Sequence, residues 1–308
     1  MTSRAMKRMP AFAVLAVTAV LATAGCSGIS DGGAPPQSDL TASPSPQTSA
    51  EIAAKIGRIE AEFAVTVGAV AVGESGQVVK YNGEARMPYA STMKVFVAAA
   101  MLASTPVDER ETIVRWKQAQ LDVAGYSPIT SEHLDDGLTL DALAEAAVRD
   151  SDNTAANLVM ESLNGPSGVQ DFLRALGDPT TVVTAYEPEL NAVVPGSDQN
   201  TSTPLALATN LKTIFEGDAL EQGSREKLLD WMGGNATGDS LIRAAAPSGW
   251  TVADKSGGAG GVRNDVAVVT TESGEQIYIA ILTATKDPAA AYTDEVVEHV
   301  ARDLLAEF

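Results

Sequence analysis

Cysteine and histidine are almost absent from this chain: its 308 residues include one cysteine and two histidines. The lone Cys26 cannot form a disulfide within the chain, so a packed core must hold the fold together. His133 and His299 are far apart and lack the spacing of metal ligands, so we interpret them as structural or surface residues. We expect neither a metal nor a cofactor in this protein.

Aromatic residues and positive charges are also scarce. Aromatic residues make up 5% of the chain and hydrophobic residues 45%, so Ala, Val and Leu must fill most of the core. The 21 Lys and Arg residues are outnumbered by 40 Asp and Glu residues, which gives a formal net charge of −19. A surface this acidic repels phosphate backbones, so we expect no nucleic-acid partner, and an anionic substrate would need cations placed at its site.

The first 25 residues have the pattern of an export signal. Three cations among the first eight residues precede an apolar run at 11–22, which is too short to span a bilayer comfortably as a stable helix. Small residues at 23–25 then lead into Cys26. This order resembles a bacterial lipoprotein signal. It predicts removal of a signal peptide at 1–25, lipidation of Cys26 and anchoring at the outer face of the cell membrane. The alternative is an ordinary signal peptide, with release to the periplasm or medium.

A change of composition marks where folding should begin. Residues 26–49 are rich in Ser, Pro, Gly and Thr and contain almost no large apolar residue, which is typical of a disordered linker. We expect residues 50–308 to fold, with a sheet-containing part at about 50–90 and 233–308 and a helical part at about 91–232.

Hydrophobic patterns support this division. The expected elements are a helix at about 52–63, strands at 64–72 and 77–82, a helix at 92–104, a mainly helical block at 105–232, strands at 266–270 and 276–285, and a helix from about 293 to the end. Residues 92–104 are apolar on nearly every side of a helix, which predicts a buried helix. Thr203-Pro204 is typical of a helix start. The sheet is thus assembled from both chain ends around a helical insertion, and a cleft between two such parts is a natural ligand site.

Ser91 and Lys94 form the first motif with chemical meaning, S-x-x-K. Residues three apart share one face of a helix, so the amine can lower the cost of deprotonating the hydroxyl. The same pattern recurs at Ser224 and Lys227, where we interpret Ser224 as the N-cap of a surface helix and Lys227 as a solvent-facing residue. Ser91 differs because it opens a buried helix, where a charged Lys94 would be costly without a purpose.

Two further motifs follow along the chain. Ser151-Asp152-Asn153 lies between two expected helices, where these residue types also serve routinely as a polar turn and cap. Lys255-Ser256-Gly257 lies at or near a strand edge, where a strand end with a glycine turn is the structural alternative.

Taken together, the three motifs, in this order and at intervals of 60 and 104 residues, resemble those of the class A serine β-lactamases and the penicillin-binding proteins. The resemblance covers about 51–308. The segment from Glu187 to Asn191 favours the β-lactamases, in which a glutamate and an asparagine at this spacing hold a water. The resemblance implies an α+β fold with an antiparallel five-stranded sheet flanked by helices, a monomer, and hydrolysis of the β-lactam ring of penicillins and cephalosporins.

The resemblance also implies catalytic roles. Ser91 would attack the β-lactam carbonyl, and Ser151 would pass a proton to the leaving nitrogen. Either Lys94 or Glu187, acting through water, would be the acylation base. Glu187 would then activate the water that hydrolyses the acyl-enzyme, and the bond between Glu187 and Pro188 would be cis.

Substrate binding would fall to residues from several parts of the chain. The carboxylate of a β-lactam would meet Lys255, Ser256 and Arg263, although a surface charge at a strand start is an alternative for Arg263. The resemblance also implies that Tyr126 forms a wall of the cleft, that Asn153 contacts the substrate side-chain amide and that Asn191 contacts the water. The backbone N–H groups of Ser91 and Gly258 would form an oxyanion hole. Arg243 and Asp254 would form a buried ion pair that supports Lys255.

Ala185 and Asn200 depart from the family pattern. Many class A enzymes carry an arginine and an aspartate at these places, and the pair closes the loop that holds the glutamate. Its absence puts the rigidity of the loop, and therefore deacylation, in question. Two rival functions stay open: a D-alanyl-D-alanine peptidase or other penicillin-binding protein, which would not need Glu187 and Asn191, and a non-catalytic lipoprotein that binds cell-wall ligands.

Overall fold

The computed structural model of the protein describes residues 46–194, 196–287 and 289–308. The expected signal peptide, Cys26 and most of the expected linker lie outside the described residues, so these assignments stay predictions. The first described helix, α1 (Pro46–Phe63), begins four residues before the boundary that we expected at residue 50.

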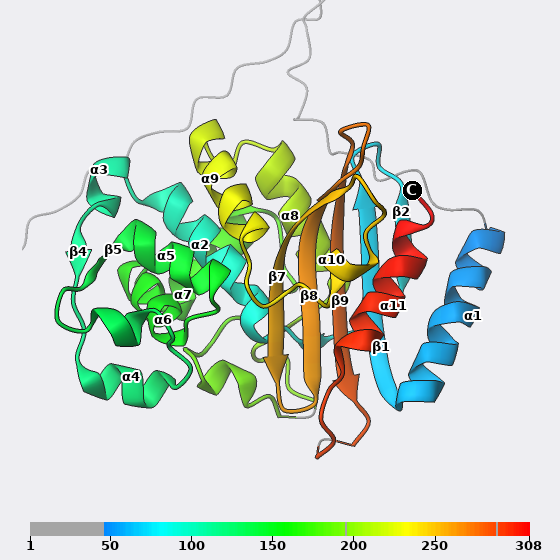
Figure 1. Ribbon diagram of the computed structural model, residues 1–308, viewed down its shortest axis with the longest axis horizontal. Coiled ribbons are helices and arrows are strands. Elements are labelled where there is room, and N and C mark those ends of the chain that lie inside the picture. Colours follow the sequence, from blue (N-terminus) through cyan, green and yellow to red (C-terminus); the bar gives the residue numbers. More distant parts are fainter. Residues whose placement is uncertain (1–45, 195, 288) are drawn as a thin grey trace, which may run out of the picture. The chain divides into compact units, whose positions relative to one another are not determined.

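The central sheet joins both ends of the described chain (Figure 1). Its strands are β1 (Val65–Gly73), β2 (Val78–Tyr81), β7 (Thr251–Ala259), β8 (Val262–Thr270) and β9 (Gln276–Thr285). Their order is β2-β1-β9-β8-β7, and every neighbouring pair is antiparallel. The predicted antiparallel five-stranded sheet built from both chain ends is therefore confirmed. Strands β1 and β9 are buried along most of their length, which explains why they are rich in Val, Ile and Ala.

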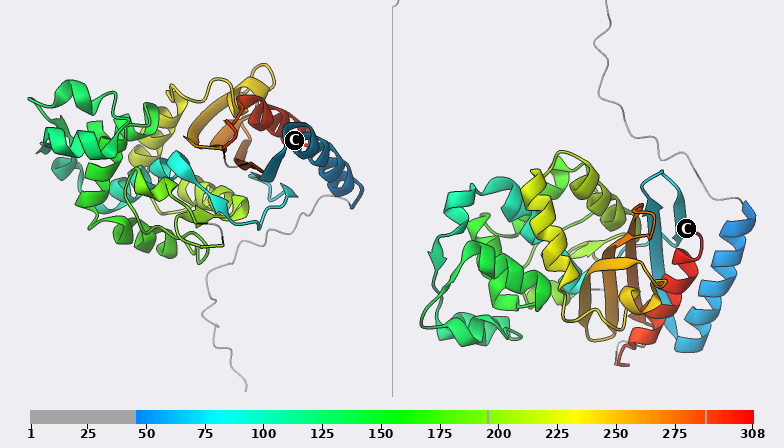
Figure 2. Two further views of the ribbon diagram at one scale, coloured as in Figure 1. Left: turned by 90° about the horizontal axis from the view of Figure 1, so that it is seen from below. Right: turned by 45° about the horizontal axis from the view of Figure 1, so that its top comes forward.

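Two terminal helices cover one face of this sheet. Helix α1 packs against α11 (Asp294–Leu305), and Figure 2 shows the two side by side. Ile52 and Ile56 of α1 are fully buried in the core that these helices share with the sheet. The short helix α10 (Ile242–Ala245) lies against α11 and completes this layer.

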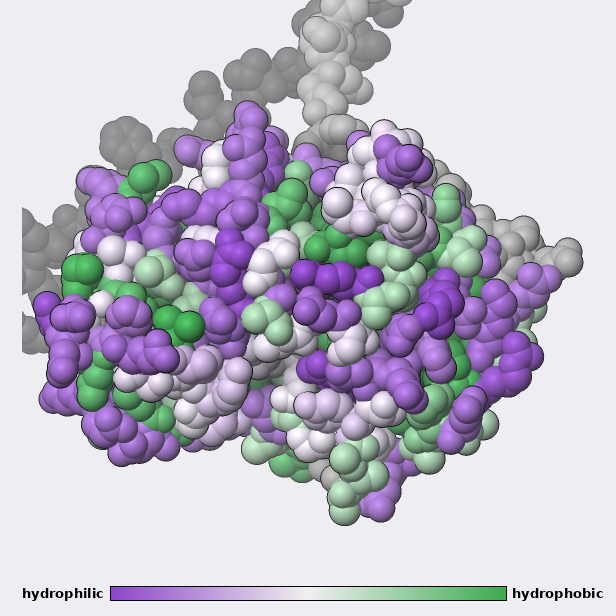
Figure 3. All heavy atoms as spheres, viewed as in Figure 1, coloured by the Kyte–Doolittle hydropathy of each residue, from purple (hydrophilic) through white to green (hydrophobic). Residues whose placement is uncertain are grey.

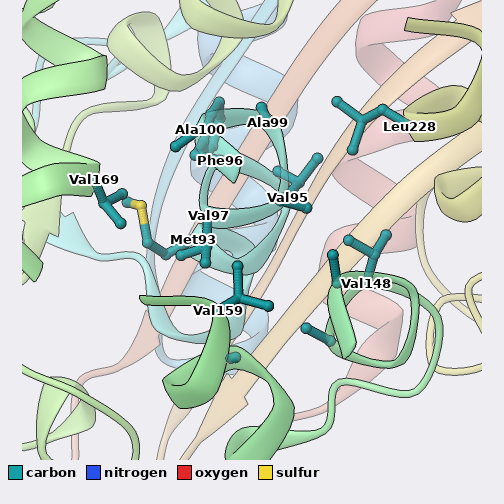
Figure 4. Close-up of a cluster of buried hydrophobic side chains, with 14 of the residues drawn as sticks. Met93, Val95, Phe96, Val97, Ala99, Ala100, Val148, Val159, Val169 and Leu228 are labelled. Atoms are coloured by element: carbon teal, nitrogen blue, oxygen red, sulfur yellow. The ribbon is translucent and has the colours of Figure 1, made fainter. Parts of the chain in front are cut away.

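The helical part packs against the opposite face of the sheet around α2 (Met93–Ser104). Every side chain of α2 from Met93 to Leu102 is buried, as its sequence predicted. Figure 4 shows α2 surrounded by apolar side chains that include Val148, Val159, Val169 and Leu228, from four other helices. A buried α2 places its N-terminus, and Ser91 just before it, where the helical part meets the sheet.

The other elements of this part complete the packing around α2. They are β3 (Met87–Pro88), α3 (Val107–Arg110), β4 (Ile113–Val114), α4 (Gln118–Ala124), β5 (Leu138–Thr139), α5 (Leu140–Arg149), α6 (Asn153–Ser162), α7 (Pro166–Ala175), β6 (Thr201–Ser202), α8 (Pro204–Glu216) and α9 (Gln222–Gly233). The Thr203 side chain caps α8 by accepting the amide of Ala206, as expected. Strands β3 and β6 pair, as do β4 and β5, so the insertion is mainly but not wholly helical.

The second S-x-x-K motif has a different structural role from the one that its sequence predicted. Helix α9 begins at Gln222, so its N-cap is Glu221 and Ser224 lies inside the first turn. Ser224 is buried and accepts a hydrogen bond from Arg110 Nη1 at 3.2 Å. Lys227 is only partly exposed, because it pairs with Asp141 and lies over the ring of Trp231. The prediction of a surface cap was wrong because a distant arginine reaches this turn.

Candidate active site

The three motifs meet at the N-terminal end of α2, beside strand β7. A cavity of about 260 Å³ lies there and is lined by Ser91, Tyr126, Ser151, Asn153, Glu187, Asn191, Thr237, Ser256, Gly257, Gly258, Arg263 and Tyr292. Lys94 and Lys255 are buried beneath it. A larger cavity of about 690 Å³, between α2 and α7, contains none of the candidate residues, so size alone does not locate the site.

Ser91 lies in a single 3₁₀ turn, Ala90–Thr92, directly before α2. Its neighbour Ala90 has a left-handed φ of 48°, a conformation that non-glycine residues rarely adopt and that is often found at functional sites. The Ser91 hydroxyl donates to Glu187 Oε1 at 3.1 Å, across 96 residues of sequence. The fold therefore places a buried carboxylate in direct contact with the predicted nucleophile.

Lys94 is the cation at the centre of the site. Its side chain is 1% exposed, and its ammonium contacts Glu187 Oε1 at 3.2 Å, the Ser151 carbonyl at 2.6 Å and Asn153 Oδ1 at 2.6 Å. The Ser151 hydroxyl lies 3.3 Å from the same nitrogen. Burial lowers the pKa of Lys94, and the nearby Glu187 carboxylate opposes this change. A lysine held in this way can exchange protons with the groups around it.

The Ser-Asp-Asn turn caps a helix and also borders the cavity. Asp152 caps α6 by accepting the amide of Ala155 at 2.8 Å, and it also accepts the amide of Thr130. Ser151 has a left-handed φ of 56° and lines the cavity. The Asn153 side chain, at the first position of α6, contacts Lys94 through its oxygen. Capping thus fixes the turn, and the residues on either side of Asp152 face the site.

The loop that carries Glu187 is fixed by two asparagines. Asn157 accepts the amide of Glu187 and donates to its carbonyl, both at 2.8 Å. Asn191 donates to Glu187 Oε2 at 2.8 Å. The Glu187-Pro188 peptide is cis, as the resemblance implies. Asn157 was missed at the sequence level, although its position four residues after Asn153 on the same helix places both on one face.

A network of uncharged groups surrounds Asn200, at the place where the resemblance led us to miss an ion pair. Asn200 Oδ1 accepts hydrogen bonds from the Thr184 amide at 3.0 Å, the Thr184 hydroxyl at 3.1 Å and the Tyr89 hydroxyl at 3.2 Å. Tyr89 is fully buried, and Ala185 packs against the core of the helical part. The loop is therefore closed at this point without charge. Arg86 adds a contact farther along, 3.3 Å from Asp198.

Strand β7 forms the opposite wall of the cavity. Lys255 is fully buried and donates to the carbonyl of Ser256 at 2.9 Å. Burial, together with the positive charge of Lys94, lowers the pKa of Lys255 to about 7. The hydroxyls of Ser256 and Thr237 are 2.6 Å apart. Thr237 was missed at the sequence level, because its position in the site depends on a long-range contact with β7.

Arg263 reaches the same wall from β8, where it pairs in register with Gly258. Its Nε donates to Asp294 at 2.6 Å, and one Nη donates to the Thr237 carbonyl at 3.3 Å. The ring of Tyr292 covers the guanidinium, with 5.2 Å between the ring centroid and Cζ. The alternative of a solvated surface charge therefore does not describe Arg263, whose side chain is only 11% exposed.

Charged groups behind β7 support its geometry. Arg243 pairs with Asp254, as the resemblance implies, and Asn235 donates to the same carboxylate. Asp254 is fully buried, whereas Arg243 is 29% exposed, so only half of the pair is buried. Asp265 is also buried, and burial raises its pKa well above the usual range. These groups set the charge around Lys255 without lining the cavity.

Two features lie on the outside of the site: the rim of the cavity and the molecular surface. Tyr126 lines the cavity and is 59% exposed, so it stands at the mouth of the site. Hydrophilic residues dominate the molecular face drawn in Figure 3.

Within residues 46–308, leaving aside 195 and 288, no three acidic, His or Cys side chains are arranged to hold a metal ion. No helix in the same part of the chain combines the length and apolarity needed to cross a bilayer.

Known proteins share both the sequence and the fold. A model of the Beta-lactamase enzyme family matches residues 50–308. A β-lactamase of Bacillus amyloliquefaciens is 42% identical over 250 residues, covering 80% of this chain and 81% of that one. A class A β-lactamase from Clostridium kluyveri matches with a TM-score of 0.81 at 37% identity, covering 84% of this chain and 99% of that one. The chain belongs to the class A serine β-lactamases.

Other members of the family agree with this placement. A β-lactamase of Nocardia farcinica is 40% identical over 253 residues, covering 81% of this chain and 80% of that one. The structure of a β-lactamase from Streptomyces albus G matches with a TM-score of 0.81 at 31% identity, covering 84% of this chain and 99% of that one. The predicted family, fold and β-lactam hydrolysis are therefore confirmed.

Proposed function

We propose that this β-lactamase hydrolyses penicillins and cephalosporins through a covalent acyl-enzyme on Ser91, which Glu187 resolves by activating a water. One observation carries the proposal. The Glu187 carboxylate contacts the Ser91 hydroxyl at 3.1 Å, the Lys94 ammonium at 3.2 Å and the Asn191 amide at 2.8 Å. A nucleophile, a buried cation and a water-positioning amide thus surround a single carboxylate, as a two-step hydrolysis requires.

In the acylation step, Ser91 Oγ bonds to the β-lactam carbonyl carbon and the ring C–N bond breaks. The proton lost by Ser91 passes to Lys94 in its neutral amine form, or to Glu187 through a water. It is then relayed through Lys94 to Ser151, whose hydroxyl gives its own proton to the leaving nitrogen. Lys94 supports either route, because its nitrogen is 3.2 Å from Glu187 and 3.3 Å from the Ser151 hydroxyl. The backbone N–H groups of Ser91 and Gly258 would stabilise the oxyanion.

The substrate is held mainly from β7 and β8. Its carboxylate lies against the hydroxyls of Ser256 and Thr237, which are 2.6 Å apart, with the cations of Lys255 and Arg263 nearby. Arg263 can donate a charge-assisted hydrogen bond to this carboxylate from Nη1. The substrate side chain extends toward Asn153 and Tyr126 at the mouth. The net charge of −19 repels an anionic substrate, and the cations at this wall offset that repulsion locally.

In the deacylation step, a water between Glu187 and Asn191 attacks the ester carbon. Glu187 takes the proton of the water, the ester C–O bond breaks and Ser91 regains its proton. Asn191 supports this step because its amide already contacts Glu187 Oε2. Asn157 supports it by holding both backbone groups of Glu187. Neither step uses a metal or a cofactor.

We also propose that the enzyme is exported as a lipoprotein, anchored through Cys26, and acts as a monomer. The basic start, the short apolar run and the small residues before Cys26 support the lipoprotein form. Cleavage before Cys26 and a diacylglyceryl group would appear in the mass of the membrane-bound protein. Cys26→Ser should release the protein from the membrane fraction while leaving its hydrolytic rate unchanged.

The catalytic proposal is tested by following β-lactam absorbance and intact protein mass together. Ser91→Ala should abolish turnover of a chromogenic cephalosporin and any adduct. Glu187→Gln should still acylate, so that the adduct accumulates while steady-state turnover falls by at least about 10²-fold. Ser224→Ala is the matched control, because Ser224 belongs to the second S-x-x-K motif but lies in α9, away from the cavity.

Each outcome has a distinct meaning. Turnover that survives Ser91→Ala would contradict the nucleophile assignment. A stable adduct on the unmodified protein, without turnover, would point to a penicillin-binding protein instead. Loss of turnover without an adduct in Glu187→Gln would place Glu187 in acylation rather than in deacylation.

A further inference from the structure

Tyr292 lies in the cavity but has no part in the chemistry described above. It belongs to the segment between β9 and α11, and its side chain is 40% exposed. One face of its ring covers the Arg263 guanidinium, 5.2 Å from the centroid. An exposed aromatic ring inside a small polar cavity is a surface that a ligand can use.

Neighbouring residues hold the Arg263 guanidinium in place and, within the described part of the chain, leave its Nη1 nitrogen free to bind a ligand. Nε donates to Asp294 and Nη2 to the Thr237 carbonyl, while Tyr292 covers the plane of the guanidinium. Among the described residues, Nη1 makes no hydrogen bond. A rigid cation with one free donor edge fixes the direction from which a carboxylate can approach.

Gly258 shows where that edge points. A Cβ atom placed on Gly258 would lie 3.4 Å from Arg263 Nη1, 3.4 Å from the Tyr292 hydroxyl and 3.5 Å from Tyr292 Cε1. The free edge of the arginine and the edge of the tyrosine ring therefore meet at one corner of the cavity, and glycine leaves that corner open. A substrate whose carboxylate lies on Arg263 must place its next ring carbon, and the substituent on it, in this corner.

We propose that Tyr292 is a specificity-determining residue that favours β-lactams with a flat, unsaturated substituent beside the carboxylate-bearing carbon, such as the C3 position of a cephalosporin. The inference rests on the proposed placement of the carboxylate at Arg263. The exposed part of the Tyr292 ring stacks against a planar substituent, and it gains little from a hydrogen atom or a methyl group. The two methyl groups of a penicillin would contact the same ring without stacking.

The test uses two cephalosporins with the same C7 side chain, one with an arylvinyl group at C3 and the other with a methyl group. Tyr292→Ala should lower kcat/KM for the arylvinyl substrate about fivefold, mainly through KM, the size expected of one aromatic contact. It should lower kcat/KM for the methyl substrate less than about twofold. Tyr292→Phe keeps the ring and should retain the wild-type ratio between the two substrates.

Three results would overturn the proposal. Equal losses on both substrates in Tyr292→Ala would mean that the ring only positions Arg263. A loss in Tyr292→Phe as large as in Tyr292→Ala would assign the contact to the hydroxyl. Unchanged kcat/KM values for both substrates in Tyr292→Ala would remove Tyr292 from substrate recognition. Hydrolysis of the methyl substrate through Ser91 reports on the proposed chemistry separately, whereas the ratio between the two substrates reports on Tyr292.

Discussion

Asn200 joins the segment before the nucleophile to the loop that carries the general base, because its Oδ1 atom accepts the Tyr89 hydroxyl at 3.2 Å. The same oxygen accepts the amide and the hydroxyl of Thr184. Tyr89 precedes Ser91 by two residues, and Thr184 precedes Glu187 by three. One uncharged side chain therefore links the two segments that carry the reacting groups.

We predict that Asn200→Leu slows deacylation more than acylation. The change leaves the Thr184 amide without its acceptor, which should lower the free energy of unfolding by about 1–3 kcal/mol. It should also let Glu187 move relative to the acyl carbon, where small displacements are costly. Stopped-flow absorbance should show a burst followed by a slower steady state, and mass spectrometry should show an acyl adduct.

Gln199→Ala serves as the control for Asn200→Leu, since Gln199 is the exposed neighbour on the same loop. It should leave burst, steady state and melting temperature unchanged. A full steady-state rate and no adduct in Asn200→Leu would contradict the role of Asn200 in positioning Glu187.

The parts of the fold that local patterns specify could be predicted from the sequence. The continuous apolar run at 92–104 predicted the buried α2, and Thr203-Pro204 predicted the start of α8. Strands β1 and β9 were expected at 64–72 and 276–285, in segments rich in Val, Ile and Ala. These features depend on residues close together in the chain, so hydrophobic period and capping chemistry are sufficient to find them.

The residues that the sequence did not reveal acquire their roles through distant contacts. Ser224 was read as a helix cap but is buried, because Arg110 reaches it from 114 residues away. Thr237 joins the site only because β7 brings Ser256 beside it. Tyr292 enters the cavity through its contact with Arg263 on β8. Neither threonine nor tyrosine carries a local signal of such a role, so only the folded chain identifies them.

Lys255 should make substrate capture depend on pH. Its pKa is lowered to about 7, first by burial and then by the charge of Lys94. A lysine is charged below its pKa, so the attraction for a substrate carboxylate should weaken as the pH rises above 7. We expect kcat/KM, which reports the free enzyme, to fall about three- to tenfold between pH 7 and pH 8.5.

Lys255→Arg tests the origin of that fall, because arginine keeps its charge throughout this range. The variant should show a flatter profile of kcat/KM against pH, even if its overall rate is lower. An equally steep fall in Lys255→Arg would assign the titration to another group of the site.

Two adjacent glycines on β7 should respond differently to a methyl group. A Cβ on Gly257 would lie 3.0 Å from the Thr92 amide nitrogen and 3.0 Å from the Tyr89 carbonyl oxygen, and these backbone atoms cannot move aside easily. The nearest atoms to a Cβ on Gly258 are side-chain atoms at 3.4 Å, an ordinary van der Waals distance.

We therefore predict that Gly257→Ala lowers the free energy of unfolding by about 1–3 kcal/mol, because it separates β7 from the turn that holds Ser91. Gly258→Ala should keep a melting temperature close to that of the wild type. Urea unfolding of the two variants in parallel measures the difference, and equal stabilities would show that β7 can move away from the turn at little cost.

Arg243→Leu should destabilise the fold in a manner that depends on pH. Asp254 is fully buried; burial raises its pKa, and Arg243 lowers it. Without the arginine, the folded-state pKa of Asp254 rises further above its value in the unfolded chain. A carboxyl group of this kind contributes stability at low pH and loses that contribution as the pH rises through its folded-state pKa.

The loss of stability in Arg243→Leu should accordingly be larger at pH 8 than at pH 5. Breaking a buried pair typically costs about 3–5 kcal/mol, and the partial exposure of Arg243 favours the lower end, about 3 kcal/mol at pH 8. The double variant with Asp254→Asn removes the buried charge and should recover part of that loss at pH 8. Urea unfolding of the single and double variants at both pH values measures these changes. A loss that is the same at pH 5 and pH 8 would mean that packing of the Arg243 side chain, rather than its charge, stabilises this side of β7.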